Sequence, residues 1–267
     1  MGTQIHSTAL VDPSAELGKN VKIGPYVLIH ADTYIGDNTC IDSFAQIKPH
    51  TRLDADNHVF SYACIGEIPQ DLKFQGEHST LEIGANNKIR EFCTINRGTG
   101  EGGGKTRIGN NCLLMAYSHV AHDCNLGDHV IMANCATLAG HVSIGDKAII
   151  GGLSAVHQFV RIGEMAFVGG KTGAAQDVPP FTLVAGERAK LEGLNLVGLR
   201  RNKTSKDDIM ALKKALRLIW YSGNTREEAV IKIKADKIYK NPKVNLLLEF
   251  LNNSNRGTVS PNLTKNG

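Results

Sequence analysis

The chain has 267 residues, 42% of them hydrophobic and 21% charged, with a formal net charge of +4. This composition excludes a disordered chain, and no apolar run approaches the roughly 20 residues of a membrane helix, so we expect no stable membrane insertion. The N-terminus lacks the basic and apolar segments of a secretion signal, which makes the cytoplasm the expected compartment.

An aliphatic residue recurs every six positions along most of the chain. The first series runs through Ile5, Val11, Leu17, Ile23, Ile29, Ile35, Ile41, Ile47, Leu53, Val59 and Ile65. A short series follows at Ile83, Ile89 and Ile95, and a second long one runs through Ile108, Leu114, Val120, Leu126, Met132, Leu138, Ile144, Ile150, Val156, Ile162 and Val168. Four positions after most members of the long series stands a small or β-branched residue, with Asn57 as the visible exception.

A six-residue repeat corresponds to one short strand and one turn. Helical stripes repeat at three and four residues and simple strands at two, so neither fits. Three repeat units close one triangular coil, with the aliphatic side chains inside and stacked on the next coil. At ~4.8 Å per coil, nine or ten coils form a prism on the order of 45 Å long. The sequence therefore predicts a parallel β-helix over residues 1–190.

The repeat is interrupted twice, and both interruptions are predicted to be loops that extend from the prism. Residues 66–80 keep the phase but lose the aliphatic residues. Between Ile95 and Ile108 the spacing is not a multiple of six, across a glycine-rich segment near 97–107. This segment lacks the GxxxxGK[ST] pattern of a phosphate-binding loop, so we expect a flexible loop. Loops on a rigid scaffold are where binding residues concentrate.

The repeat ends at residues 177–180, and residues 191–267 are predicted to form an α-helical domain. Ser205 and Thr225 are expected to begin two helices, the first ending at Gly223, and Asn241-Pro242 to begin a third. Residues 200–267 hold 15 Lys and Arg against 6 Asp and Glu, whereas residues 1–199 hold 15 against 20. The basic end is a candidate docking face for an acidic partner, and a solvated helical surface is the alternative.

The densest polar cluster lies at residues 119–124. His141 stands one position beyond a full three-unit coil from His122, and His157 stands two positions short of a further coil from His141. The coil therefore brings the three histidines near one edge, and three interpretations remain open. His122 could act as a general base, with Asp123 fixing its tautomer. The three histidines could instead bind a metal, as in the γ-class carbonic anhydrases built on this kind of repeat, or they could be structural groups at subunit contacts.

Residues 119–124, 138–141, 156–159 and 176–180 together resemble the UDP-N-acetylglucosamine 3-O-acyltransferases of lipid A biosynthesis, a hexapeptide-repeat acyltransferase family. So do residues 68–73, 89–91 and 96–99, and the resemblance covers nearly the whole chain. It implies a left-handed parallel β-helix followed by a C-terminal α-helical domain. It also implies transfer of a 3-hydroxyacyl group from acyl carrier protein to the 3-hydroxyl of UDP-N-acetylglucosamine, the first step of lipid A biosynthesis.

Residue by residue, the resemblance makes His122 the general base, Asp123 its orienting partner and the Gly140 N–H the donor to the oxyanion. The positions that match substrate-binding residues are Gln70, Asp71, Lys73, His119, His141, His157, Gln158, Asn195 and Arg201. Gly170 matches a position where a small residue leaves room for a long acyl chain. The chain departs from a well-known form of the family at Asn96, Val197 and Asn202.

The resemblance further implies a cytoplasmic homotrimer with each site between two subunits, and no nucleic-acid partner. It implies no metal, and no cofactor apart from the phosphopantetheine that belongs to the acyl carrier protein. The acidic carrier protein suits the basic residues Lys213, Lys214, Arg217, Lys232, Lys234 and Lys237. A sibling N-acyltransferase carries an extra N-terminal uridine-binding domain, which is not expected here because the repeat begins at Ile5.

Overall fold

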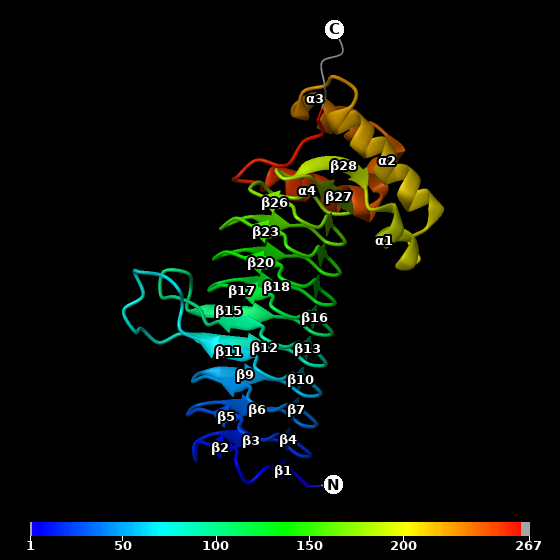
Figure 1. The fold of residues 1–267 in the computed structure, drawn as a ribbon. Helices are drawn as coiled ribbons and strands as arrows, with labels where there is room; N and C mark the ends of the chain where they lie inside the picture. The colour runs from blue at the N-terminus through cyan, green and yellow to red at the C-terminus, as the bar shows by residue number, and fades with distance from the viewer. Residues whose placement is uncertain (1, 263–267) are drawn as a thin grey trace.

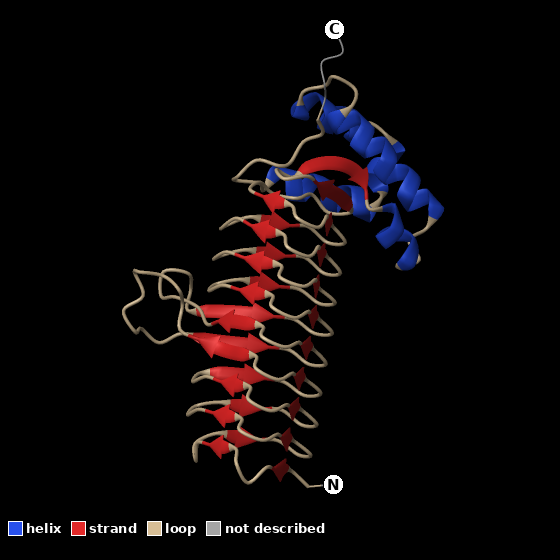
Figure 2. Ribbon diagram, viewed as in Figure 1, coloured by secondary structure: helices blue, strands red, loops and turns tan. Residues whose placement is uncertain are grey.

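The computed structural model describes residues 2–262 and consists of a triangular β-solenoid followed by a group of helices (Figures 1 and 2). Successive strands enter three sheets in turn, so that each sheet receives every third strand of the solenoid. In the described residues, sheet A has 11 strands, sheet B has nine and sheet C has eight. The predicted parallel β-helix with C-terminal helices is confirmed.

The strands of the solenoid are short because each coil turns three corners, one for each hexapeptide unit. Sheet A contains β1 (Gln4–Ile5), β4 (Lys22–Ile23), β7 (Cys40–Ile41), β10 (His58–Val59), β13 (Lys88–Ile89), β16 (Leu113–Leu114), β19 (Ile131–Met132), β22 (Ile149–Ile150), β25 (Phe167–Val168), β27 (Thr182–Ala185) and β28 (Lys190–Leu194). Sheet B contains β2 (Leu10–Val11), β5 (Leu28–Ile29), β8 (Gln46–Ile47), β11 (Cys64–Glu67), β14 (Thr94–Asn96), β17 (His119–Val120), β20 (Thr137–Leu138), β23 (Ala155–Val156) and β26 (Gly173–Ala174). Sheet C contains β3 (Glu16–Leu17), β6 (Tyr34–Ile35), β9 (Thr51–Leu53), β12 (Thr80–Ile83), β15 (Lys105–Ile108), β18 (Asn125–Leu126), β21 (Ser143–Ile144) and β24 (Arg161–Ile162).

The aliphatic residues of the repeat form the core of the prism. In sheet A, Ile23, Ile41, Val59 and Ile89 pair directly across neighbouring strands and are almost completely buried. The pattern weakens at the first coil, where Ile5 is 49% exposed, because no coil lies beneath it. Each interior coil is therefore stabilised by the apolar rows of the coils above and below it.

The exception at Asn57 has a structural explanation. Asn57 is buried, and its amide donates hydrogen bonds to the carbonyl oxygens of Asp54 (2.7 Å) and Gly84 (2.8 Å). Its side-chain oxygen accepts from the N–H of Asn87, which occupies the same position in the next coil. Because every polar atom of the Asn57 amide group finds a partner, the asparagine ladder replaces the usual small apolar residue without an unsatisfied group.

Two loops extend from the edge where sheet B passes into sheet C, which we call the B–C edge (Figure 1). They span residues 68–79, between β11 and β12, and 97–104, between β14 and β15. Lys73 of the first loop pairs with Glu101 of the second at 3.2 Å, and the Gly100 N–H donates to Glu77 at 3.0 Å. The two loops therefore support each other beside the prism.

Sheet A continues beyond the end of the repeat. Strand β27 pairs in parallel with β25, and β28 then turns back antiparallel to β27. The domain boundary that the sequence places between residues 190 and 191 thus falls inside β28, because a hairpin extends the sheet without hexapeptide spacing.

The helices that follow pack around a second hydrophobic core. They are α1 (Leu196–Arg201), α2 (Lys206–Trp220), α3 (Arg226–Lys234), the 3₁₀ helix η1 (Lys237–Lys240) and α4 (Pro242–Asn252). The predicted helix starts at Ser205, Thr225 and Asn241 are confirmed, since each side chain accepts a hydrogen bond from the first turn. Helix α2 ends at Trp220, before the expected end at Gly223. None of the described helices is both long enough and apolar enough to cross a membrane.

Candidate active site

A cluster of polar side chains lies on the B–C edge, in the turns that follow β17 and β20. His122 Nδ1 lies 2.8 Å from Asp123 Oδ2, and the ring of His141 meets that of His122 edge to face with centroids 5.1 Å apart. His141 Nε2 is 3.7 Å from the same carboxylate oxygen. The three-unit coil therefore brings His122, Asp123 and His141 together, as their spacing predicts.

Asp123 is the most deeply buried member of the cluster, with a side chain only 1% exposed. Its Oδ1 accepts a hydrogen bond from the Thr99 N–H (2.9 Å), and its Oδ2 accepts one from the Thr99 hydroxyl (2.7 Å). The sequence gives no local signal for these contacts, because Thr99 stands far before Asp123 in the chain and lies in the glycine-rich loop. That loop therefore reaches back to cover the carboxylate.

The contact with Asp123 involves one particular nitrogen of His122. In the tautomer with hydrogen on Nδ1, that nitrogen donates to the Asp123 carboxylate and the lone pair of Nε2 is left available. Gly140, one coil further on, lies directly against this ring: a Cβ on Gly140 would be 2.5 Å from His122 Cε1 and 2.7 Å from Nε2. Within residues 2–262 the Gly140 N–H donates no hydrogen bond. The arrangement thus combines a basic nitrogen with a free N–H donor.

The surroundings of His119 and His141 lower the pKa of both side chains and so favour their neutral forms. Burial lowers the pKa of His119 below its ordinary value, and the neighbouring His122 lowers it further. Thr94 Oγ1 contacts His119 Nδ1 at 2.7 Å. Burial also lowers the pKa of His141, although the Asp123 carboxylate opposes the shift. At neutral pH both rings can therefore donate and accept hydrogen bonds.

His157 and Gln158 lie on the same edge but apart from this cluster. His157 is exposed, and its Nδ1 lies 3.2 Å from the guanidinium of Arg256. Among the described residues, the donor atoms close enough to share a metal ion belong to His122, Asp123 and His141, and in a second group to Cys40, Asp42 and His58. His122, His141 and His157 therefore lie on the same edge, but His157 is too far from the other two to share a metal ion with them in one chain.

The predicted residues of the first loop stand beside the cluster. Gln70 and Lys73 are exposed, and Asp71 accepts a hydrogen bond from the backbone N–H of Lys73 at 3.0 Å. The Asp71 carboxylate is near enough to His141 to favour its protonated form, against the effect of burial on the pKa. Asn96 lies buried below the loop and donates to the Ile68 carbonyl oxygen at 2.9 Å. Asn96 therefore supports the base of the loop.

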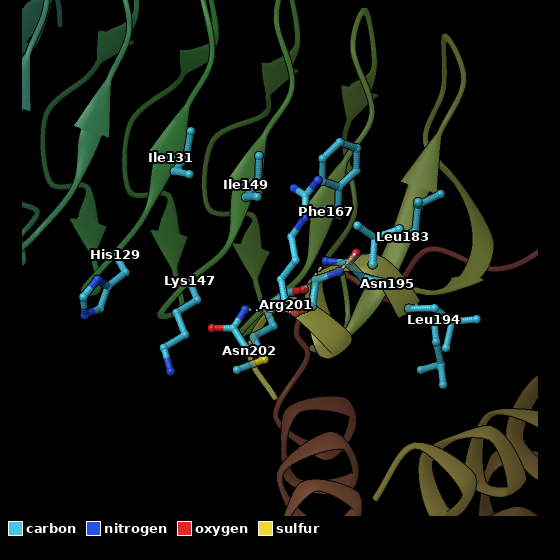
Figure 3. A pocket seen from close by; sticks show the side chains of 14 residues that line it. His129, Ile131, Lys147, Ile149, Phe167, Leu183, Leu194, Asn195, Arg201 and Asn202 are labelled. Carbon is cyan, nitrogen blue, oxygen red and sulfur yellow. Dashed lines mark hydrogen bonds between the residues drawn. The ribbon is translucent and has the colours of Figure 1, made fainter. Parts of the chain in front are cut away.

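The predicted nucleotide-contacting residues Asn195 and Arg201 line a separate cavity of about 620 Å³ against sheet A (Figure 3). Arg201, the last residue of α1, and Asn202, its C-cap, are exposed, whereas Asn195 is buried and caps the start of that helix. The Asn195 amide also donates to the Met165 carbonyl oxygen at 2.9 Å, so its side chain is already used to fix α1. Val197 completes this wall of the cavity.

The cavity and the histidine cluster lie on opposite sides of the prism. Each coil passes through sheets A, B and C in that order, so sheet A is the face opposite the B–C edge. One chain therefore does not bring Asn195 or Arg201 to His122. Gly170 lies on a third position, the edge between sheets A and B, where a Cβ would come 3.3 Å from the Gly152 carbonyl oxygen.

Known proteins are similar to this chain in both sequence and architecture. The family model described as UDP N-acetylglucosamine O-acyltransferase, domain 2, matches residues 177–259, and the bacterial transferase hexapeptide model matches residues 105–140. The acyl-[acyl-carrier-protein]–UDP-N-acetylglucosamine O-acyltransferase of Thermodesulfovibrio yellowstonii is 48% identical over 254 residues, which are 95% of this chain and 98% of the relative. The chain belongs to the UDP-N-acetylglucosamine O-acyltransferase family.

Solved structures of O-acyltransferases in this family superpose over almost the entire chain. LpxA from Acinetobacter baumannii is 43% identical with a TM-score of 0.92, covering 96% of this chain and 99% of that one. The UDP-N-acetylglucosamine acyltransferase of Francisella novicida is 33% identical with a TM-score of 0.94, covering 97% and 95%. The predicted family and the left-handed β-helix are thereby confirmed, and the chain is an acyltransferase.

Proposed function

We propose that the chain transfers a 3-hydroxyacyl group from acyl carrier protein to the 3-hydroxyl of UDP-N-acetylglucosamine, the first step of lipid A biosynthesis. Membership of the O-acyltransferase family supports the reaction class. The hydrogen-bonded pair His122–Asp123, with Gly140 packed against the imidazole, is the observation that carries the mechanism.

In this mechanism His122 is the general base. Its Nε2 removes the proton from the sugar 3-hydroxyl, and the sugar oxygen attacks the thioester carbonyl carbon. The Gly140 N–H stabilises the negative charge on the carbonyl oxygen of the tetrahedral intermediate. When the carbon–sulfur bond breaks, the imidazolium returns its proton to the departing phosphopantetheine thiolate, and the ester remains on the sugar. Asp123 stabilises the imidazolium throughout.

The other residues of the B–C edge are assigned to substrate binding. Asp71 and Lys73 hold the sugar and its phosphates, and Gln70 lies next to them on the same loop. His119, His141, His157 and Gln158 are assigned to the remainder of the substrate site along this edge. Gly170 is assigned to the acyl chain, because a Cβ at this position would come 3.3 Å from the Gly152 carbonyl oxygen and reduce the space there. We expect no metal and no separate cofactor, because the phosphopantetheine is part of the acyl carrier protein.

We also propose a homotrimer in which each site is built by two chains. The support is geometric, because Asn195 and Arg201 border a cavity on the face opposite His122. A nucleotide sugar that reaches both this cavity and His122 must therefore lie between two neighbouring prisms. Arg201 is exposed and its fixed positive charge suits a phosphate. The departures at Val197 and Asn202 lie in this half of the site, apart from His122.

The acyl carrier protein is proposed to dock on the basic helical region. The side chains that form this surface are all exposed: Lys213, Lys214, Arg217, Lys232, Lys234 and Lys237. Lys214 is already paired with Asp236, which leaves the other five as the main attraction for an acidic partner. The proposal places the enzyme in the cytoplasm, with no nucleic-acid partner.

The test is transfer of 3-hydroxyacyl chains of several lengths from acyl carrier protein to UDP-N-acetylglucosamine and to its 3-amino analogue. We expect the wild-type enzyme to acylate the 3-hydroxyl and His122→Ala to lose almost all turnover while its unfolding transition is unchanged. His6→Ala, at an exposed histidine of the first coil, is the matched control and should retain activity. Full activity of His122→Ala would refute the mechanism, and zinc-dependent hydration of carbon dioxide would favour the metal-site alternative.

A further inference from the structure

We propose that Thr99 and Gly102 of the glycine-rich loop are positioning residues. They hold the Asp123 carboxylate in the orientation in which it contacts His122 and fixes the position of that ring. This inference rests on the proposed function and deepens it. It gives residues 97–104 a role in the proton transfer, in place of the flexible loop that their composition predicts.

Thr99 holds Asp123 by both carboxylate oxygens. The backbone N–H donates to Oδ1 at 2.9 Å and the side-chain hydroxyl donates to Oδ2 at 2.7 Å, so the carboxylate is fixed about its Cβ–Cγ bond. The same Oδ2 accepts from His122 Nδ1 at 2.8 Å. Because the carboxylate is 1% exposed, water cannot replace a donor that is lost.

The loop also fixes the direction of the Thr99 hydroxyl. The Gly102 N–H donates to Thr99 Oγ1 at 3.1 Å, which leaves the hydroxyl hydrogen free to point at Asp123. The N–H groups of Gly102 and Gly104 both donate to the Thr99 carbonyl oxygen, at 3.2 and 2.7 Å, and close a tight turn around it. The turn, the hydroxyl and the carboxylate thus form one connected chain of hydrogen bonds that ends at His122.

Gly102 is required by space. A Cβ at this position would lie 2.0 Å from Asp123 Cγ and within 2.3 Å of both carboxylate oxygens. Gly102 is absent from the residues with positive φ, so its backbone conformation alone does not demand glycine. Gly100 differs, because a Cβ there would meet only the flexible side chain of Glu77, at 3.2 Å. The two glycines therefore form a matched pair for mutagenesis.

The other side of Asp123 is held by the strand that follows the loop. The Asp123 N–H donates to Thr106 Oγ1 at 2.8 Å, and Thr106 belongs to β15. His141 Nε2 stands 3.7 Å from Asp123 Oδ2 and is the alternative partner if the carboxylate turns. Without the Thr99 hydroxyl, Asp123 is free to turn towards His141, and His122 loses the group that fixes its tautomer.

The experiment compares Thr99→Val with Thr99→Ser in steady-state acyl transfer. We expect Thr99→Val to lower kcat on the order of 10- to 100-fold with KM unchanged, by analogy with the loss of a partner that orients a metal-binding histidine. Thr99→Ser keeps the hydroxyl and should restore kcat. In nitrogen NMR of the protein, the His122 ring should change from a single protonated Nδ1 in the wild type to a mixture of tautomers in Thr99→Val.

The second pair of variants is Gly102→Ala and Gly100→Ala. Gly102→Ala should lose at least as much kcat as Thr99→Val, whereas Gly100→Ala should stay near wild type; this pair decides the question if Thr99→Val does not fold. Wild-type kcat in Thr99→Val or Gly102→Ala, or a raised KM with kcat intact, would overturn the inference. The His122→Ala variant separates the two possible failures. If only this inference is wrong, His122→Ala is still inactive; if the proposed function is wrong, His122→Ala is active.

Discussion

The A–B edge and the B–C edge of the prism use the same turn and carry different side chains. On the A–B edge, the left-handed position of five successive coils is occupied by aromatic residues, and their rings stack with centroids 4.9 to 5.1 Å apart: Tyr26, Phe44, Tyr62, Phe92 and Tyr117. On the B–C edge, the left-handed positions are occupied by Asp32 and His50 in early coils and, beyond the two loops, by Asp123, His141 and Phe159. There the ring of Phe159 stacks on His141 at 4.4 Å.

The difference between the edges is in what covers the column of side chains. The A–B rings remain 43% to 59% exposed and contact one another, so their interactions stabilise the stacking of the coils. On the B–C edge, Phe159 is equally exposed at 50%, whereas the Asp123 side chain is 1% exposed and is covered by Thr99 of the glycine-rich loop. The comparison teaches that one backbone geometry aligns side chains in a column, and that an insertion at one edge can bury a single member of that column, as Thr99 buries Asp123.

The largest effect is expected from adding a methyl group on the B–C edge. In Gly140→Ala the new Cβ would overlap the His122 ring, so the imidazole must leave its present position beside Gly140. We expect kcat to fall about 10²- to 10³-fold, comparable to the loss of an oxyanion donor. Steady-state kinetics and the unfolding transition measure the two consequences. Unchanged kcat would show that the position of the His122 ring does not matter for turnover.

A change on the A–B edge should affect stability and leave turnover unchanged. Phe92→Ala removes a ring that stacks on both Tyr62 and Tyr117, so we expect the free energy of unfolding to fall by about 1–3 kcal/mol. Tyr26→Ala removes a ring with one stacked neighbour and should cost less. Chemical denaturation followed by acyl-transfer assays compares the two variants. If Phe92→Ala kept full stability but lost kcat, the A–B edge would contribute to turnover, which would contradict its assignment as a structural edge.

The smallest effect is expected on the pH dependence of stability, through His119. Because the pKa of His119 is lowered by burial, the unfolded chain binds a proton at this position at a higher pH than the folded protein does. The contribution of neutral His119 to stability is therefore present above pH ~6.5 and is lost as the pH falls below that value. We expect His119→Gln to reduce the loss of unfolding free energy between pH 7 and pH 5, measured by denaturation at each pH. An identical loss in both proteins would assign the acid sensitivity elsewhere.

The repeating part of the fold could be predicted from the sequence because its signal is local and repeated. Residues such as Ile23, Ile41 and Val59 keep strict spacing, and each position has the same environment in every coil. The helix starts were predictable for a similar reason, since Ser205 and Thr225 satisfy backbone groups of their own first turns. The hairpin β27–β28 was not predictable from the repeat, because it pairs with sheet A without the six-residue spacing.

The sequence by itself determined the solenoid and the grouping of His122, Asp123 and His141, because coil length converts sequence spacing into spatial position. The tertiary structure alone decided that Thr99 covers Asp123 and that Asn195 and Arg201 lie on the face opposite His122. The physical reason is that these relations depend on how far a loop folds back and on which side of a closed prism a helix packs. Neither is encoded in the six-residue period.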